Sequence, residues 1–127
     1  MILVDTSVWV DHLRVGEQRL VALLQDSLVL AHPFVIGELA LGTLHNREQV
    51  LGLLSALPQT PVATHEETMQ FIENFGLYGR GIGYVDSHLL AAARLQSDAC
   101  LWTRDKRLQK VAVDLRMAME EPKRLKG

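Results

Sequence analysis

Four carboxylates are notable for their position relative to apolar segments. Asp5 directly follows the apolar run 2–4, and Asp105 comes shortly after a second run, 99–102. Glu38 and Asp86 each lie alone among apolar residues. A carboxylate on an apolar face is costly unless it takes up a proton or meets a cation. Since Mg²⁺ and Mn²⁺ prefer oxygen ligands, the four acids predict a site for one or two such ions.

The residues around Glu38 and Asp86 make these two acids hard to explain as ordinary surface charges. The segment 33–42 contains no charged residue besides Glu38. Asp86 is the only acid between Glu73 and Asp98, and only Arg80 could reach it from the preceding loop, which leaves a plain salt bridge open. We therefore expect both acids to lie on apolar helix faces and not to act as helix caps, whereas Asp5 and Asp105 could each cap a helix.

Polar residues next to the acids could support such a site. The hydroxyls of Thr6, Ser7 and Thr103 could orient carboxylates or water, although Ser7 could equally cap the first helix. Arg80 and Arg104 could bind the phosphates of a polyanion. Zinc is not expected, because the five histidines show no paired metal spacing and a single cysteine cannot complete a thiolate site. We interpret all five histidines as surface or packing residues.

Composition indicates one soluble domain. The chain has 127 residues, 48% of them hydrophobic, and a net charge of −2. Excluding the four acids leaves a slight excess of positive charge, with basic residues concentrated after residue 103, which suits a polyanionic ligand. We expect a single domain over 1–121 and a basic, mobile tail over 122–127. The sequence shows no membrane span or signal peptide, so a cytoplasmic protein is predicted.

The elements that must position the acids alternate along the chain. Strands are predicted at 2–4, 28–31, 61–63, 99–102 and 115–118. Helices are predicted at 7–14, 17–25, from Pro33 onward, and at 47–56, 64–78, 84–96 and 105–113, with a capping signature at Thr64 and Glu67. This alternation is typical of an α/β domain whose parallel sheet is covered by helices on both faces. Asp5 and Asp105 would then share the edge formed by the carboxyl ends of the strands.

Four motifs in register resemble one known family. They are Ile-Leu-Val-Asp5-Thr-Ser, Glu38 in an apolar helix, Gly-Ile-Gly-Tyr-Val-Asp86-Ser-His, and Trp-Thr103-Arg-Asp105-Lys-Arg. Together they resemble the PIN-domain family, and specifically the VapC toxins of toxin–antitoxin pairs. The resemblance covers nearly the whole chain. Ser87 departs from it, since many relatives carry alanine there.

The resemblance implies a fold and a function. The fold would be a three-layer sandwich with a roughly five-stranded parallel sheet. The function would be Mg²⁺- or Mn²⁺-dependent endoribonuclease activity, often against transfer RNA or ribosomal RNA. Asp5 and Asp86 would be direct ligands, Glu38 a ligand or a residue that orients water, and Asp105 an outer member. Relatives commonly form homodimers, and a small VapB-like antitoxin inhibits them by filling the acidic site with its C-terminal segment.

Two other classes of function remain open from the residues. A receiver-like phosphoacceptor domain has similar length and an acidic pocket on a parallel sheet. It would need paired acids after the first strand, where Asp5 stands alone before Thr6 and Ser7. A non-catalytic binding module with the same fold is the second alternative, and the presence of all four acids argues against it.

Overall fold

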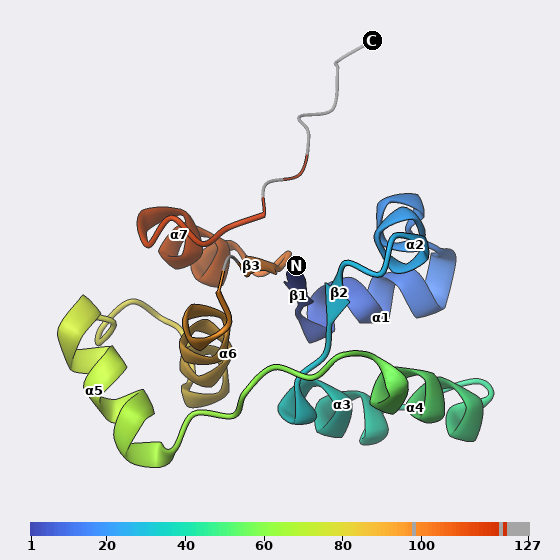
Figure 1. Cartoon of the computed structure of the whole chain (residues 1–127), viewed down its shortest axis with the longest axis horizontal. Coiled ribbons are helices and arrows are strands. Elements are labelled where there is room, and N and C mark those ends of the chain that lie inside the picture. Colours follow the sequence, from blue (N-terminus) through green and yellow to red (C-terminus); the bar gives the residue numbers. More distant parts are fainter. Residues whose placement is uncertain (98, 120, 122–127) are drawn as a thin grey trace, which may run out of the picture.

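The structure is a computed structural model that describes residues 1–97, 99–119 and 121. These residues form three strands and seven helices, which alternate along much of the chain (Figure 1). The strands are β1 (Ile2–Val4), β2 (Val29–Leu30) and β3 (Cys100–Trp102). The helices are α1 (Thr6–Val15), α2 (Gln18–Gln25), α3 (Pro33–Ala40), α4 (Arg47–Ala56), α5 (His65–Phe75), α6 (Tyr84–Leu95) and α7 (Lys106–Asp114).

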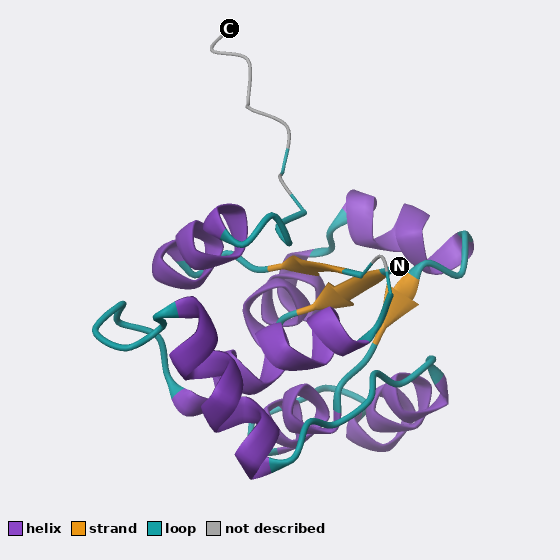
Figure 2. Ribbon diagram, turned by 60° about the vertical axis from the view of Figure 1, so that its left-hand side comes forward, coloured by secondary structure: helices purple, strands orange, loops and turns teal. Residues whose placement is uncertain are grey.

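The sheet is parallel and has the order β2-β1-β3. Leu3 pairs with Leu30 on one side and with Leu101 on the other, so β1 is the central strand. Helices lie on both sides of the strands, which makes the predicted α/β sandwich correct (Figure 2). Because all three strands are parallel, their carboxyl ends meet at one edge, and Asp5 lies at the end of the central strand.

The sheet has fewer strands than the roughly five expected. The predicted strand at 61–63 is wrong. A single parallel bridge joins Gln59 to Ala31 instead. The ladder stops there because the next bond would need an N–H from residue 33, which is a proline and begins α3. The predicted strand at 115–118 is reduced to one bridge between Ala118 and Leu101. Arg116 has a φ of 59°, a left-handed conformation that an extended strand does not contain.

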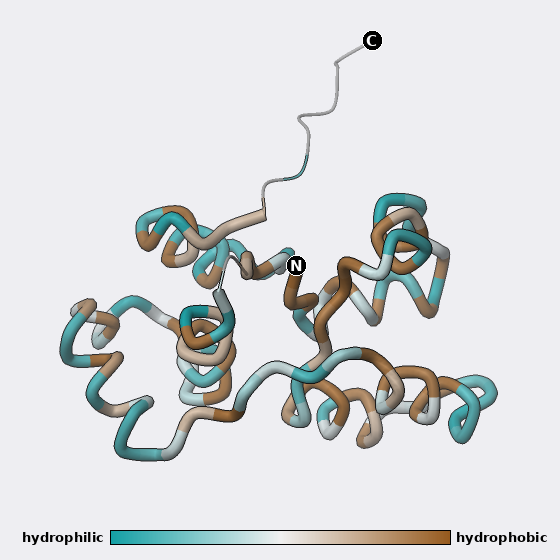
Figure 3. Tube along the Cα trace, in the orientation of Figure 1, coloured by the Kyte–Doolittle hydropathy of each residue, from teal (hydrophilic) through white to brown (hydrophobic). Residues whose placement is uncertain are grey.

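The core is built on the strands and on α6. β1 and β2 are among the most hydrophobic segments of the chain (Figure 3). Leu3 and Val4 of β1 and Leu101 and Trp102 of β3 are all 0% exposed. α6 contributes seven consecutive buried residues, 87–93, because its alanines allow close packing on both sides. Apolar burial of this kind holds the end of β1 and the start of α6 in fixed positions.

Several helix ends agree with the sequence, but the end of α5, at Phe75 and not Tyr78, and the start of α1 do not. The capping box of Thr64 and Glu67 is present at α5, and Pro33 opens α3. α4 has the predicted bounds. α1, however, begins at Thr6 with Asp5 in the N-cap position, so the prediction that Ser7 caps this helix is wrong. The hydroxyl of Ser7 bonds to the carboxylate of Asp5 instead.

The predicted basic tail, 122–127, lies outside the described residues. Across the described part of the chain, no helix combines the length and the apolar character that crossing a bilayer requires.

Candidate functional site

Asp5 is the most buried of the four acids, with 7% of its surface exposed. Its backbone N–H donates to the carbonyl oxygen of Trp102 at 2.9 Å, which continues the pairing of β1 with β3 beyond the strand. Asp5 occupies the N-cap position of α1, but its side chain makes no capping bond. Instead, its Oδ2 accepts hydrogen bonds from the hydroxyls of Ser7 at 2.9 Å and Thr103 at 2.7 Å. Two neutral donors therefore hold this carboxylate, and no cation among the described residues forms an ion pair with it.

The two hydroxyls are themselves fixed by the backbone that follows β3. Ser7 Oγ accepts from the N–H of Arg104 at 3.0 Å, and Thr103 Oγ1 accepts from the N–H of Asp105 at 3.1 Å. Because each hydroxyl has only one proton, donating it to Asp5 and accepting an N–H defines its orientation. The orienting role predicted for Ser7 and Thr103 thus has a geometric basis.

Asp105 is an exposed acid at the start of α7. Its Oδ1 accepts from the backbone N–H of Leu108 at 2.9 Å, so Asp105 caps the helix, as the sequence allowed. Capping places its carboxylate at the same edge of the sheet as Asp5, since residues 103–105 directly follow β3.

Asp86 is partly buried in the first turn of α6. Its Oδ2 accepts from the N–H of Gly83 at 3.0 Å, so the expectation that Asp86 has no capping contact is wrong. Burial raises the pKa of Asp86, the Gly83 N–H opposes this, and the negative charges of Asp5 and Asp105 raise it further. Asp86 therefore senses both other acids, which places three carboxylates within electrostatic range of one another.

Glu38 belongs to α3 and is exposed, so the expectation that it lies on a buried apolar face is wrong. Only Val35 and Leu39 of α3 are buried, and Leu41, three residues after Glu38, is itself 90% exposed. Its Oε1 accepts a hydrogen bond from Thr6 Oγ1 at 2.9 Å. Since Thr6 is adjacent to Asp5, this bond ties the fourth acid to the same edge. The hydroxyl predicted to support the site thus binds Glu38 and not Asp5.

The acids suit a hydrated ion better than a fully protein-ligated one. Within the described ranges, no three Asp, Glu, His or Cys side chains lie close enough together to hold one metal ion by themselves. Mg²⁺ commonly retains several waters and is bound through one or two carboxylates. The four acids fit Mg²⁺ or Mn²⁺ for three reasons. They offer oxygen donors, the charges of its neighbours repel the charge on Asp86, and no protein cation in the described part is paired with them.

Arg104 lies among carboxylates that the sequence analysis did not assign to it. Its Nη1 donates to Asp11 at 2.8 Å, its Nη2 to Glu17, and its Nε to Glu121 at 2.9 Å. Its guanidinium also lies over the ring of Trp102, 5.7 Å from the centroid. The hydrogen bonds to Glu17, Asp11 and Glu121 raise the pKa of Arg104 above its usual value. The bond from Arg104 in turn lowers the pKa of Glu17.

Arg80 forms an ion pair with Asp114 at 2.6 Å, so the possible salt bridge between Arg80 and Asp86 is not made. Phosphate binding by Arg80 or Arg104 stays a prediction. All three guanidinium nitrogens of Arg104 already donate to carboxylates, whereas Arg80 uses one of its nitrogens for Asp114.

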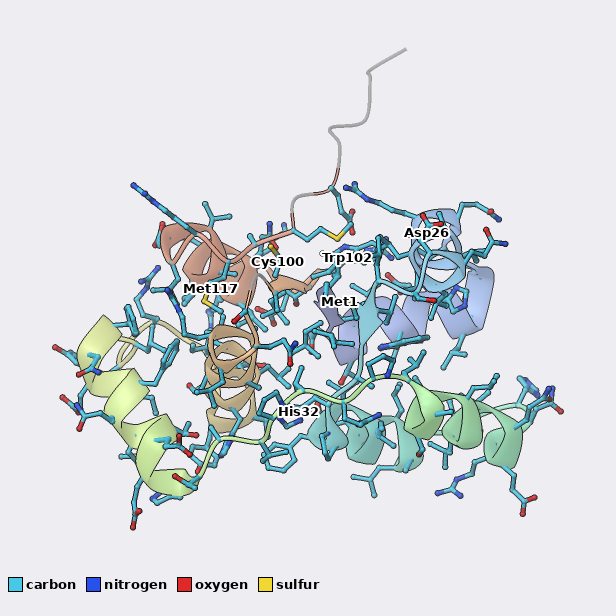
Figure 4. The ribbon with its side chains drawn as sticks, viewed as in Figure 1. Met1, Asp26, His32, Cys100, Trp102 and Met117 are labelled. Carbon is cyan, nitrogen blue, oxygen red and sulfur yellow. The ribbon has the colours of Figure 1, made fainter. Side chains whose placement is uncertain are left out.

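Two histidines are buried in the packing between helices, as Figure 4 shows for His32. His32 is 0% exposed, and its Nδ1 accepts from the N–H of Phe34, which caps α3. Burial, with a smaller effect from His88, lowers the pKa of His32 to about 4. Phe34 packs between the rings of His32 and His88, with centroids 4.9 Å from each. The packing interpretation is confirmed for these two residues. Neither belongs to the acidic edge, the name used here for Asp5, Glu38, Asp86 and Asp105 at the carboxyl ends of the strands.

Comparison with known proteins agrees with this geometry. The family model described as the PIN domain matches residues 2–114. Ribonuclease VapC32 from two strains of Mycobacterium tuberculosis is 50% identical over 121 residues, which covers 95% of this chain and 98% of that protein. A chain of the crystal structure of FitAcB from Neisseria gonorrhoeae superposes with a TM-score of 0.61 at 25% identity, covering 89% of this chain and 94% of the other. The chain therefore belongs to the PIN domain family, among its VapC-type members.

Proposed function

We propose that this protein is a Mg²⁺- or Mn²⁺-dependent endoribonuclease that acts as the toxin of a toxin–antitoxin pair. The observation that carries the proposal is Asp5: a buried carboxylate at the end of the central strand, held by two hydroxyls and within electrostatic range of Asp86. The name of the ribonuclease that is 50% identical supports RNA as the substrate.

The four acids would have different roles in binding the ion, according to their positions. Asp5 and Asp86 would hold the ion directly, and Asp105 would contribute from outside through water. Glu38, the exposed acid bonded to Thr6, would bind the ion or orient the attacking water. A divalent cation bound here would supply positive charge to the scissile phosphate and lower the pKa of a water.

The chain's own residues then set the geometry of attack. Ser7 and Thr103 keep Asp5 in one orientation, and the Gly83 N–H does the same for Asp86. Water attacks phosphorus, the bond to the 3′ oxygen breaks, and that oxygen takes up a proton. The products therefore carry a 5′-phosphate and a 3′-hydroxyl, since the ribose 2′-OH does not take part.

Partners follow from the VapC-type relatives. We propose transfer RNA or ribosomal RNA as the substrate, a VapB-like antitoxin as the inhibitor and a homodimer as the assembled form. The similarity to Ribonuclease VapC32 over 95% of the chain supports an RNA substrate, and the VapC-type relationship together with the likeness to a FitAcB chain supports an antitoxin partner. The choice of transfer or ribosomal RNA and the homodimer follow from the family resemblance alone.

A cleavage assay with end analysis tests the reaction. Purified protein is incubated with total RNA in Mg²⁺, in Mn²⁺ or in excess EDTA, and the ends are sequenced with and without prior phosphatase treatment. We expect cleavage only with metal, restored when metal is added back, and 5′-phosphate ends. Full activity in EDTA, or 2′,3′-cyclic phosphate ends, would contradict the proposal.

A further inference from the structure

Arg107 packs directly on the backbone of Gly81. A Cβ added at Gly81 would come within 2.7 Å of Arg107 Cδ and 3.0 Å of Nη1, so any other residue type at 81 would displace the Arg107 side chain from this position. Gly81 also has a φ of +80°, which favours glycine independently of the contact. The loop therefore accommodates one particular guanidinium.

This contact lies between the elements that carry two of the acids. Arg107 is in the first turn of α7, two residues after Asp105. Gly81 precedes Gly83 by two residues, and the N–H of Gly83 holds Asp86. The Arg80–Asp114 ion pair ties the same loop to the last residue of α7, so the loop between α5 and α6 is fixed to α7 at both ends of that helix (Figure 1).

Charge pairing separates Arg107 from the other arginines near the acidic edge. Arg80 has one carboxylate partner and Arg104 has three. Arg107 is exposed and forms no ion pair with any residue that the structure describes. A guanidinium offers a planar fork of donors that matches the oxygens of a phosphate. An unpaired guanidinium held beside the acids can bind a phosphate without first releasing a carboxylate.

We propose that Arg107, held in place by its contact with Gly81, binds a backbone phosphate of the RNA next to the cleaved bond. This inference rests on the proposed ribonuclease function and assigns the phosphate contact to a residue other than Arg80 and Arg104. Gly81 is then a positioning residue, because it determines where the guanidinium lies.

The first test measures RNA affinity. A labelled single-stranded RNA is titrated with the Asp5→Asn protein, which is expected to bind without cutting, at several salt concentrations. Arg107→Gln in this background should weaken binding about tenfold and reduce the slope of log K against log salt by about 0.7. Arg47→Gln, which removes the same charge from α4, is the control and should leave the slope unchanged. Affinity and slope unchanged in Arg107→Gln would overturn the inference.

A pair of glycine variants tests the positioning role. Gly79 has a φ of +71° and nothing within 4 Å of an added Cβ, whereas Gly81 has a similar φ and the Arg107 side chain in the way. Both alanine variants thus introduce backbone strain, but only Gly81→Ala displaces Arg107. We expect Gly81→Ala to weaken RNA binding as much as Arg107→Gln, with no further loss in the double variant, and Gly79→Ala to bind normally. Equal effects of the two alanines would refute the contact's role.

Failure of the underlying function would look different. A protein that neither cleaves nor binds RNA before any change at Arg107 refutes the ribonuclease proposal. A protein that cleaves RNA but tolerates Arg107→Gln refutes only the assignment of the phosphate contact.

Discussion

Two groups of carboxylates meet at residues 103–105, and they differ in whether a protein cation is paired with them. Asp11, Glu17 and Glu121 surround the guanidinium of Arg104, which we call the Arg104 group. Asp5, Glu38, Asp86 and Asp105 form the acidic edge, where the side-chain partners in the described part are hydroxyls and backbone N–H groups. The first group carries its own cation, and under the proposed function the second would take one from solution.

One acid from each group, Glu17 and Asp86, has a shifted pKa, and the two shifts have opposite directions. The hydrogen bond from Arg104 lowers the pKa of Glu17, whereas burial and the neighbouring charges of Asp5 and Asp105 raise that of Asp86. A lowered carboxyl pKa means that the folded state favours the ionised form, and a raised one means that it disfavours it. Ionised Glu17 thus stabilises this fold, whereas ionised Asp86 is retained at some cost to stability.

The largest expected effect is at the acidic edge. Asp5→Asn should reduce RNA cleavage more than about 100-fold, because loss even of an outer partner of a metal ligand costs about 10–100-fold. Stability should stay the same or rise slightly, because the amide oxygen can still accept from Ser7 and Thr103 while one of the repelling charges disappears. Cleavage rates and urea denaturation of the same preparations measure both quantities. Cleavage within a few-fold of the unmodified protein would refute the role of Asp5.

A substitution in the Arg104 group should instead lower the stability of the protein. Arg104→Gln should lower the free energy of unfolding by about 2 kcal/mol, between the values for buried and exposed ion pairs, since the side chain is 28% exposed. Arg14→Gln is the matched control, because Arg14 pairs with the same Asp11 at 3.6 Å while 73% exposed. Arg14→Gln should lower the free energy of unfolding by less than about 0.5 kcal/mol. Equal losses in urea denaturation would remove the contrast between the two groups.

The pH dependence of the free energy of unfolding can distinguish the two groups of acids only after the contribution of His32 is known. Its pKa is lowered from 6.5 to about 4, so between these values the unfolded chain binds a proton that the folded chain does not. Stability is therefore lost as the pH falls from 6.5 toward 4, by up to about 1.4 kcal/mol per pH unit. The lowered pKa of Glu17 causes a loss only below its ordinary value of 4.5.

His32→Asn should remove the first of these losses, because an asparagine can still cap α3 but does not titrate. Urea denaturation at intervals between pH 7 and 4 measures it, with His45→Asn, at an exposed histidine, as the control. If the slope between pH 6.5 and 4.5 persists in His32→Asn, another buried group is responsible.

Much of the fold could be predicted because its signals are local. The short apolar strands, Pro33, the Thr64–Glu67 capping box and the cap at Asp105 all operate within one turn of chain. The capping contact of Asp86 was missed although its spacing of three from Gly83 matches that of Thr64 and Glu67. That spacing was a usable signal.

The remaining features depend on contacts between distant segments. Glu38 was expected to be buried because its helical neighbours are apolar, but the direction in which a helix face points depends on tertiary packing. The partners of Arg104 lie 93 and 87 residues away, at Asp11 and Glu17. No pattern of spacing within a single sequence reveals such pairs.

The bond from Thr103 to Asp5 joins residues 98 positions apart, and the Ser7–Thr103 contact spans 96. These are contacts of very high sequence separation, which form late because a long loop must close first. Asp5 and Ser7 are made 98 and 96 residues before Thr103, so during synthesis this carboxylate gains its second hydroxyl donor long after its first. A nascent chain that ends before residue 103 would therefore lack the Thr103 bond that helps to orient Asp5.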